Sequence, residues 1–344
     1  MITEASCGLY GGLDLHSSNV YCGIKDREGR RVYKKRLPTD LGVILEELEP
    51  YRERLKGIAV ESTYNWYWLV DGLQEAGFPT RLANPARMDQ YEGLKVTDDR
   101  SDAFWLAEML RLGILPEGYI YPKEVRPVRD MLRRRLLIVR QRTQMILSLQ
   151  SMVVRMTGNS VSGTKLKQWT CQEVTDTFVD PDTQETAWTM LQLIQKQDAL
   201  EKALGKSVLT KAKLCAPFNN LLTVPGIGNA LGITIMLENG PMERFKTAGC
   251  YASYCRTVAS RRESNGKKKG ENNRKNGNKY LAWAYVEAAN FAQRYDPVVQ
   301  GWFQRKTRRT CRAVAVKALA CKLSKAVFYI LRDGVEFDRE MMFG

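Results

Sequence analysis

Residues Gly8–Leu15 read GLYGGLDL, a short run that is apolar apart from one acid, Asp14. Two further strand-like runs follow, Val20–Lys25 (VYCGIK) and Arg31–Leu37 (RVYKKRL), and the segment 26–30 (DREGR) supplies a turn between them. Short connections of this kind join strands that pair antiparallel. The sequence therefore predicts three successive antiparallel strands near the start of the chain.

The next segment alternates between helical and strand patterns. Leu41–Glu49 carries apolar residues at helical spacing before Pro50 interrupts it. Gly57–Val60 (GIAV) is typical of a buried strand, Tyr64–Ala76 is predicted to be a helix, and Pro79–Leu82 a further short strand. Antiparallel strands followed by alternating strands and helices predict a mixed-sheet α/β domain.

Four carboxylates fall at informative places in this domain. Asp14 lies near the end of the first strand, and Glu61 ends the fourth. Asp99 and Asp102, three residues apart, share one face of a helix predicted to run on to Leu112. Since a charge at the end of a buried strand is costly unless it is paired or metal-bound, the four acids could hold two Mg²⁺ ions and clamp a phosphodiester for in-line attack.

Each acid also has an ordinary explanation. The segment 98–102 could cap a helix N-terminus, where acidic side chains are favourable in any case. Asp14 could form a salt bridge, and Glu61 could begin a loop. Their order, strand Asp, strand Glu and helical Asp-x-x-Asp, is similar to that of ribonuclease H-like nucleases, which favours the catalytic interpretation.

The middle of the chain is predicted to be helical. Val125–Met156 has no breaker after Pro127 in its first turn, and its apolar residues alternate with arginines. A second helical stretch follows at Thr183–Leu204. The two predict an antiparallel hairpin or coiled coil. It would serve as a spacer, or for self-association with its arginine face against nucleic acid.

Two features mark the last third of the chain. The first is Leu222–Gly228 (LTVPGIG) before a predicted helix, Ala230–Leu237, where the backbone N–H groups near Gly226 and Gly228 can meet a phosphate. Turns of this kind also occur for packing reasons. Further helices are predicted at Phe245–Tyr254, Lys279–Gln293, Asp296–Lys306 and Cys311–Leu331.

The second feature is Arg261–Gly277 (RRESNGKKKGENNRKNG), which contains no apolar residue and so cannot be a core helix or strand. Its one serine, Ser264, lies among cations that attract phosphate, and could be a nucleophile or an ordinary polar loop residue. The cations predicted to bind nucleic acid here and just beyond are Arg261, Arg262, Lys267, Lys268, Lys269, Arg274, Lys275 and Lys279.

Composition favours a partner that carries negative charge. The chain of 344 residues has a formal net charge of +15, usual for a protein that handles nucleic acid. Its eight cysteines include no Cys-x-x-Cys pair and its one histidine is His16, which argues against a structural zinc site and against catalysis by histidine. Without an apolar run of membrane length, the expected location is the cytoplasm.

These residues together resemble a known family. The four acids look like those of a RuvC-like domain. The segment 225–228, together with Arg262–Lys267, Gly270, Lys275, Gly277, Asn278 and Leu281, looks like a serine-bearing transposase domain. The combination resembles the DEDD transposases of the IS-one-ten family of insertion sequences. The Asp-Leu-His after the first strand and the glycine- and lysine-rich loop suggest its IS-eleven-eleven branch.

The resemblance implies a fold, a reaction and partners. It implies a RuvC-like (ribonuclease H-like) domain over residues 1–122, a helical coiled-coil segment over 123–215, and a mainly helical transposase domain over 216–344. Ser264 would form a phosphoserine link with DNA, assisted by Mg²⁺ at the acids Asp14, Glu61, Asp99 and Asp102. The partners would be donor and target DNA, a bridge RNA encoded by the element, and further copies of the chain in a dimer or tetramer, in the bacterial cytoplasm at the nucleoid.

Two other functions fit the residues. One is a RuvC-like junction nuclease that uses water and metal at the acids and leaves no covalent link to DNA. The other is a non-catalytic nucleic-acid-binding protein with a decayed nuclease fold, for which the presence of all four acids is unexpected.

Overall fold

The computed structural model describes residues 8–88, 99–212, 217–258, 262–270 and 276–343, without the side chains of 99–101, 212, 262–264, 268 and 270. The contacts within it divide the chain into two compact units. The first comprises residues 1–123 with 261–276, and the second residues 124–260 with 277–344. The three-part division drawn from the sequence stays a prediction.

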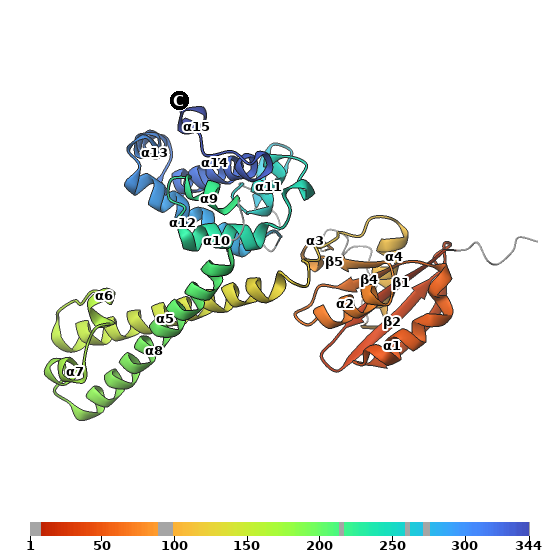
Figure 1. The fold of residues 1–344 in the computed structure, drawn as a ribbon, viewed down its shortest axis with the longest axis horizontal. Coiled ribbons are helices and arrows are strands. Elements are labelled where there is room, and N and C mark those ends of the chain that lie inside the picture. Colours follow the sequence, from red (N-terminus) through yellow and green to blue (C-terminus); the bar gives the residue numbers. More distant parts are fainter. Residues whose placement is uncertain (1–7, 89–98, 213–216, 259–261, 271–275, 344) are drawn as a thin grey trace, which may run out of the picture. The chain divides into compact units, whose positions relative to one another are not determined.

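The first unit contains a five-stranded mixed sheet of order β3-β2-β1-β4-β5 (Figure 1). Strands β1 (Leu9–Leu15), β2 (Asn19–Lys25) and β3 (Arg31–Pro38) pair antiparallel, as predicted. Strands β4 (Leu55–Glu61) and β5 (Thr80–Ala83) add parallel to β1. The parallel pairs need crossovers, which explains why helices separate these strands in sequence.

One face of the sheet is covered by α1 (Leu41–Leu48) and α2 (Tyr67–Glu75). The core between them contains the alternate strand residues Leu13, Ile24 and Ile58, all fully buried. The helix predicted from residue 64 begins three residues later, at Tyr67. A 3-10 helix, η2 (Glu49–Arg54), with Pro50 in its first turn, and the short helix α3 (Pro85–Met88) were not predicted.

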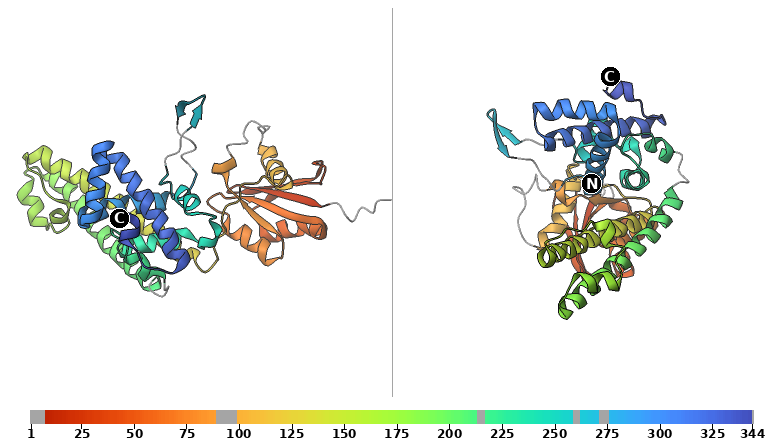
Figure 2. Two further views of the ribbon diagram at one scale, coloured as in Figure 1. Left: turned by 90° about the horizontal axis from the view of Figure 1, so that it is seen from above. Right: turned by 90° about the vertical axis from the view of Figure 1, so that its left-hand side faces the viewer.

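The other face is covered by α4 (Asp99–Arg111), on the opposite side of the sheet from α1 and α2 (Figure 2). Glycines on the strands make room for it. A Cβ at Gly12 would lie 1.9 Å from the carbonyl oxygen of Ala103, and one at Gly23 would lie 2.9 Å from the ring of Phe104. The backbone of α4 therefore rests directly on β1, because glycine has no side chain to hold it away.

The second unit is helical. Its long helices α5 (Arg126–Thr157) and α8 (Pro181–Ala212) pair antiparallel, as predicted (Figure 1). At one end of the hairpin Leu132 packs in a core with Val208, and at the other Val153 packs in a core with Ala187. Helix α8 extends eight residues beyond the predicted end. Two unpredicted short helices, α6 (Gly163–Leu166) and α7 (Cys171–Thr177), close the tip.

The remaining helices of this unit surround a separate core that contains Tyr251, Tyr285 and Phe328. The helices are α9 (Pro217–Leu222), α10 (Asn229–Asn239), α11 (Ala248–Tyr254), α12 (Lys279–Tyr295), α13 (Pro297–Arg309), α14 (Arg312–Asp333) and α15 (Arg339–Phe343). Helices α10, α12, α13 and α14 lie close to the predicted ranges, and α11 begins at Ala248 rather than at Phe245, after the 3-10 helix η4 (Met242–Arg244). The short helices α9 and α15 were not predicted. Over the described parts of the chain, no helix combines the length and apolar character needed to cross a membrane.

Candidate active site

The sheet register brings two of the predicted acids into one row. Leu13 of β1 pairs with Val60 of β4, so the next residues along these parallel strands, Asp14 and Glu61, are neighbours. Asp14 comes two residues after Gly12, and Glu61 comes two residues after Ala59. Helix α4 covers both Gly12 and Ala59. Because side chains alternate along a strand, Asp14 and Glu61 lie on this same face of the sheet. Asp14 is 3 % exposed, and Glu61 is half-buried.

Helix α4 directs its N-terminal end toward this row. Its first turns pass over the middle of β1, where Ala103 meets Gly12. Its last residue, Arg111, donates to the carbonyl of Arg27 in the β2–β3 turn, at the opposite end of the sheet. The helix start, with Asp102 one residue before Ala103, thus lies at the end of β1 that carries Asp14. Asp99 begins the helix, and its side chain is outside the described residues.

Carboxylate oxygens are ligands that Mg²⁺ accepts in proteins. Asp14, Glu61 and Asp102 are the described side chains that would hold it, with Asp99 as the fourth. Among the side chains that the structure describes, no three acids, cysteines or histidines are close enough to form a metal site. A complete ligand set therefore needs Asp99 or a closer approach of α4.

One neighbour of the acids was missed from the sequence. His16 Nε2 lies 3.0 Å from Asp14 Oδ2, and its ring meets the edge of Tyr21 at 6.1 Å between centroids. The backbone carbonyl of His16 accepts a hydrogen bond from Asn65 Nδ2. The spacing of two residues from Asp14, just past the end of the strand, was the available signal.

Ser264 lies at the tip of a small hairpin that was not predicted. Strand β6 (Arg262–Ser264) pairs with β7 (Lys267–Gly270), and Ser264 is opposite Lys267. The two turn residues, Asn265 and Gly266, have φ of 52° and 71°, the left-handed values of a type I′ turn. Asn-Gly is the dipeptide such turns favour, so the signal was present in the sequence. The side chains that the structure describes in this hairpin are exposed, in agreement with the lack of apolar residues in the segment.

The predicted cations of this segment are only partly described. Lys267, Lys269 and Lys279 have exposed side chains, and Lys279 Nζ lies 5.4 Å from the ring centroid of Tyr280. The hairpin is grouped by its contacts with the first unit, which also contains the acids. The other predicted cations lie outside the described residues or side chains: Arg261, Arg262, Lys268, Arg274 and Lys275.

The ends of the serine-bearing segment are held together in the second unit. Asn278 N donates to the carbonyl of Tyr254 at 2.7 Å, and Arg256 Nη2 donates to the carbonyl of Gly277 at 3.0 Å. Gly277 has φ of 85°, and a Cβ there would lie 2.5 Å from the Tyr254 carbonyl oxygen. Asn278 Oδ1 then accepts from the N–H groups of Tyr280 and Leu281 and caps α12.

A buried ion network lies beside the point where the two ends of the serine-bearing segment meet. The Glu238 side chain is fully buried and accepts from Arg129 and Arg133 of α5 and from Asn278 Nδ2 at 2.7 Å. Burial opposes ionisation, but the hydrogen bond from Arg133 and the positive charges of Arg129 and Arg133 prevail and lower the pKa of Glu238. One carboxylate thus joins α5, α10 and the start of α12.

The arginine-rich face predicted for α5 is only partly exposed. Arg133, Arg135 and Arg142 are held in ion pairs within the unit, with Glu238, Glu201 and Asp198 among their partners. Such arginines join helices rather than face solvent. Of the arginines of α5, Arg134, Arg140 and Arg155 are exposed.

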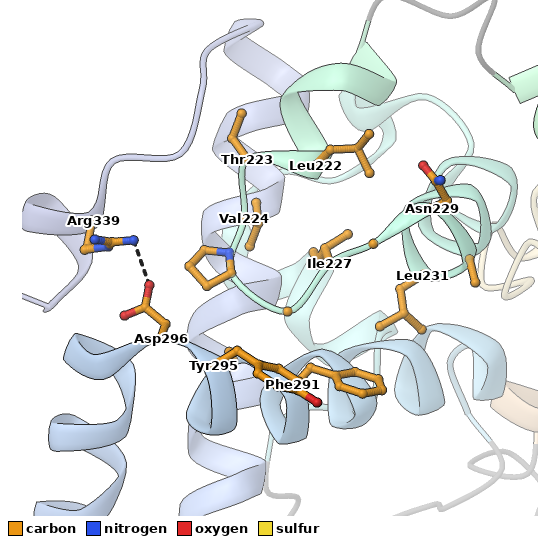
Figure 3. Close-up of a pocket in the computed structure, with 15 residues that line it drawn as sticks. Leu222, Thr223, Val224, Ile227, Asn229, Leu231, Phe291, Tyr295, Asp296 and Arg339 are labelled. Atoms are coloured by element: carbon orange, nitrogen blue, oxygen red, sulfur yellow. Dashed lines mark ion pairs between the residues drawn. The ribbon is translucent and has the colours of Figure 1, made fainter. Parts of the chain in front are cut away.

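The Pro-Gly-Ile-Gly turn lines a pocket of about 630 Å³ between α9 and α10, with residues of α12 on its other wall (Figure 3). Gly226 has φ of 81°, and a Cβ there would lie 2.2 Å from the Ala288 carbonyl oxygen of α12, so packing alone requires glycine. Gly228 faces open space and precedes α10 without a side-chain cap. Of the two predicted contacts, Gly228 is therefore the one that leaves room for a phosphate.

Aromatic rings form the opposite wall of this pocket. Phe291 and Tyr295 lie one turn apart on α12 and stack with their planes 14° apart (Figure 3). Tyr295 is 72 % exposed. At the end of the wall, Asp296 caps α13 and pairs with Arg339 at 2.8 Å. The carboxylate of Asp296 is therefore neutralised within the fold and does not repel an anion at the turn.

Two family models match the chain. One, described as a transposase and built on the IS110 DEDD enzymes, matches residues 11–157. The other, described as the transposase IS116/IS110/IS902 family, matches residues 218–304. No curated protein shows significant similarity to the chain.

The first match contains Asp14, Glu61, Asp99 and Asp102, and the second contains the Pro-Gly-Ile-Gly turn and Ser264. A mixed α/β domain with carboxylates at strand and helix ends, followed by a helical part and matched by these two models, supports a DNA transposase or recombinase. Both models describe transposases of the IS110 type, and the residues that they match together make up well over half of the sequence.

Proposed function

We propose that this transposase cuts and rejoins DNA through Ser264, with the acids Asp14, Glu61, Asp99 and Asp102 of a RuvC-like domain assisting. The observation that carries the proposal is the row formed by Asp14 and Glu61, toward which α4 directs its acidic N-terminal end. Support also comes from the serine segment, whose two-residue turn presents Ser264 beside the tip of a cationic hairpin.

The reaction begins when Ser264 Oγ attacks the scissile phosphorus. A bond forms between this oxygen and the phosphorus, the serine hydroxyl loses its proton, and the bond to one deoxyribose oxygen breaks as that oxygen gains a proton. The product is a phosphoserine-linked DNA end and a free hydroxyl end. A second DNA hydroxyl that attacks the same phosphorus reverses these bond changes and joins a new pair of ends.

The other residues act by holding charge and position. Mg²⁺ at the four acids would neutralise the charge that develops on the phosphate oxygens. Lys267 and Lys269 beside the serine would hold the DNA backbone, and Lys279 would do so at the start of α12. At the Pro-Gly-Ile-Gly turn, the backbone N–H groups that begin α10 would bind a further phosphate near Gly228.

The proposal includes three kinds of partner: DNA, a bridge RNA and further copies of the chain. Donor and target DNA would be selected by a bridge RNA, which leaves the protein to bind nucleic-acid backbone and shape, by analogy with other RNA-guided enzymes. Copies of the chain would associate as a dimer or tetramer through the α5–α8 hairpin, which exposes Leu147 (60 %) and Leu193 (47 %). The site of action would be the bacterial nucleoid, in the cytoplasm.

Denaturing electrophoresis after incubation with labelled DNA and Mg²⁺ tests the nucleophile. Wild-type protein is expected to retain the label covalently, and Ser264→Ala to lose both the adduct and strand cleavage while still binding DNA. Ser253→Ala, which removes an exposed hydroxyl on α11, is the matched control and should still form the adduct. Cleavage by Ser264→Ala without an adduct would instead support the metal-and-water nuclease.

Asp102→Asn separates an enzyme from a binding protein. It removes one charge from the N-terminal end of α4 and should abolish cleavage with little effect on DNA affinity. A non-catalytic binder would show no strand cleavage in either form of the protein. Sequencing of RNA that copurifies with the chain tests the bridge RNA, and light scattering measures the number of subunits.

A further inference from the structure

The acid row continues across the sheet to its open edge. Asp14 of β1 pairs in register with Tyr21 of β2, and Tyr21 pairs with Arg36 of β3. Side-chain contacts follow the same path: Asp14 Oδ2 lies 3.0 Å from His16 Nε2, the rings of His16 and Tyr21 lie 6.1 Å apart, and the Arg36 guanidinium lies 5.8 Å from the Tyr21 ring centroid. Residues from three strands thus lead from the acids to edge strand β3.

The cations at the end of this path lie on the acid face of the sheet. Side chains alternate along a strand, so Lys34 and Arg36 share one face and Lys35 takes the other. Gly23, which pairs with Lys34, lies against Phe104 of α4, and this identifies the α4 side as the face of Lys34 and Arg36. Lys35 is bonded to Glu47 of α1 on the opposite side.

Both cations are available to a ligand. The side chains of Lys34 and Arg36 are exposed, and the contact of Arg36 with Tyr21 holds its guanidinium beside the row without neutralising it. At about 4.8 Å between strands, Arg36 lies roughly 10 Å from Asp14, within the reach of one DNA strand that passes through the acid site. Positive charge at this distance complements a phosphate backbone.

We propose that this surface, Asp14–His16–Tyr21–Arg36 with Lys34, is the track on which the scissile DNA strand leaves the acid site, with Lys34 and Arg36 bound to its phosphates. The inference rests on the proposed function, since the acids define where the strand begins. Cations on an edge strand also prevent edge-to-edge aggregation, but that role would apply to Lys35 equally. If DNA affinity depends on the cations of only one face of β3, those cations bind DNA, whereas protection against aggregation would involve both faces.

The test compares single substitutions on the two faces of β3. The full-length chain and its variants Lys34→Gln, Arg36→Gln and Lys35→Gln each bind a labelled single-stranded DNA oligonucleotide without divalent metal, and the dissociation constant is measured from low to high salt. Each variant loses one positive charge, so a general effect of net charge is the same for all three. Leaving out divalent metal keeps the DNA uncut, so the result is independent of the nucleophile.

Each lost phosphate contact should reduce the slope of log K against log salt by about 0.7 and weaken binding by about fivefold at 0.1 M salt. We expect this loss for Lys34→Gln and Arg36→Gln and not for Lys35→Gln. Equal slopes for Arg36→Gln and Lys35→Gln would overturn the proposal. So would a loss confined to an RNA oligonucleotide of the same sequence, which would assign the surface to RNA. A failed Ser264 adduct test would refute the proposed nucleophile and leave this binding result unaffected.

Discussion

Replacement of Gly12 by alanine should separate the candidate acids without touching any of them. A Cβ at this position would lie 1.9 Å from the carbonyl oxygen of Ala103 and 2.8 Å from the backbone nitrogen of Ala107. Contacts of a Cβ shorter than 3.0 Å essentially do not occur, and both atoms belong to the α4 backbone. The helix must therefore retreat from β1 by about 1 Å or more.

The retreat moves Asp102 away from the row of Asp14. A displacement of about 1 Å at a catalytic group costs on the order of 10²-fold in rate, so DNA cleavage by Gly12→Ala should fall by about that factor. Overpacking of this kind also lowers the free energy of unfolding by about 1–3 kcal/mol, which leaves the domain folded at 25 °C. Single-turnover DNA cleavage and thermal unfolding measure the two effects.

Gly11→Ala is the matched control. It lies on the same strand but on the other face, where its Cβ would meet the side chain of Ile58 at 3.3 Å, which can adjust. It should keep cleavage within a few-fold of wild type. If folded Gly12→Ala cleaves DNA at the wild-type rate, the contact of α4 with β1 does not position the acids, and the reasoning fails.

Three further predictions concern stability and binding. Glu238→Ala leaves the buried Arg129 and the half-buried Arg133 without their carboxylate and should cost roughly 3–5 kcal/mol in urea unfolding, whereas the exposed Glu243→Ala should cost little. The hydrogen bond from Arg111, with Lys25, lowers the pKa of Glu108 to about 2. The ionised Glu108 therefore contributes fully to the free energy of unfolding above about pH 4.5, and this contribution is lost as the pH falls toward 2. The stability difference between wild type and Glu108→Gln should therefore shrink over that range, and a constant difference would contradict it. Gly226→Ala should destabilise the fold, whereas Gly228→Ala should unfold like wild type and bind DNA more weakly in a titration.

The elements of the first unit could be predicted closely from the sequence. The first three strands agree with the structure to within a residue, because alternation of side chains and short turns are local properties. The Asn265-Gly266 hairpin shows the opposite case: its signal was local and complete, but the glycines were interpreted as a loop. Helix α8 was predicted too short because the pattern after residue 204 is more polar than its packing against α5 requires.

The sequence by itself determined the types of side chain available to this protein: acids at strand and helix ends, a serine among cations, and glycines where backbones must approach closely. Those are properties of neighbours along the chain. Only the tertiary structure decided that Asp14 lies beside Glu61, that His16 contacts Asp14, and that Glu238 joins residues up to 109 positions away. Such contacts depend on strand register and helix packing, in which a shift of one residue turns every side chain of a strand to the other face.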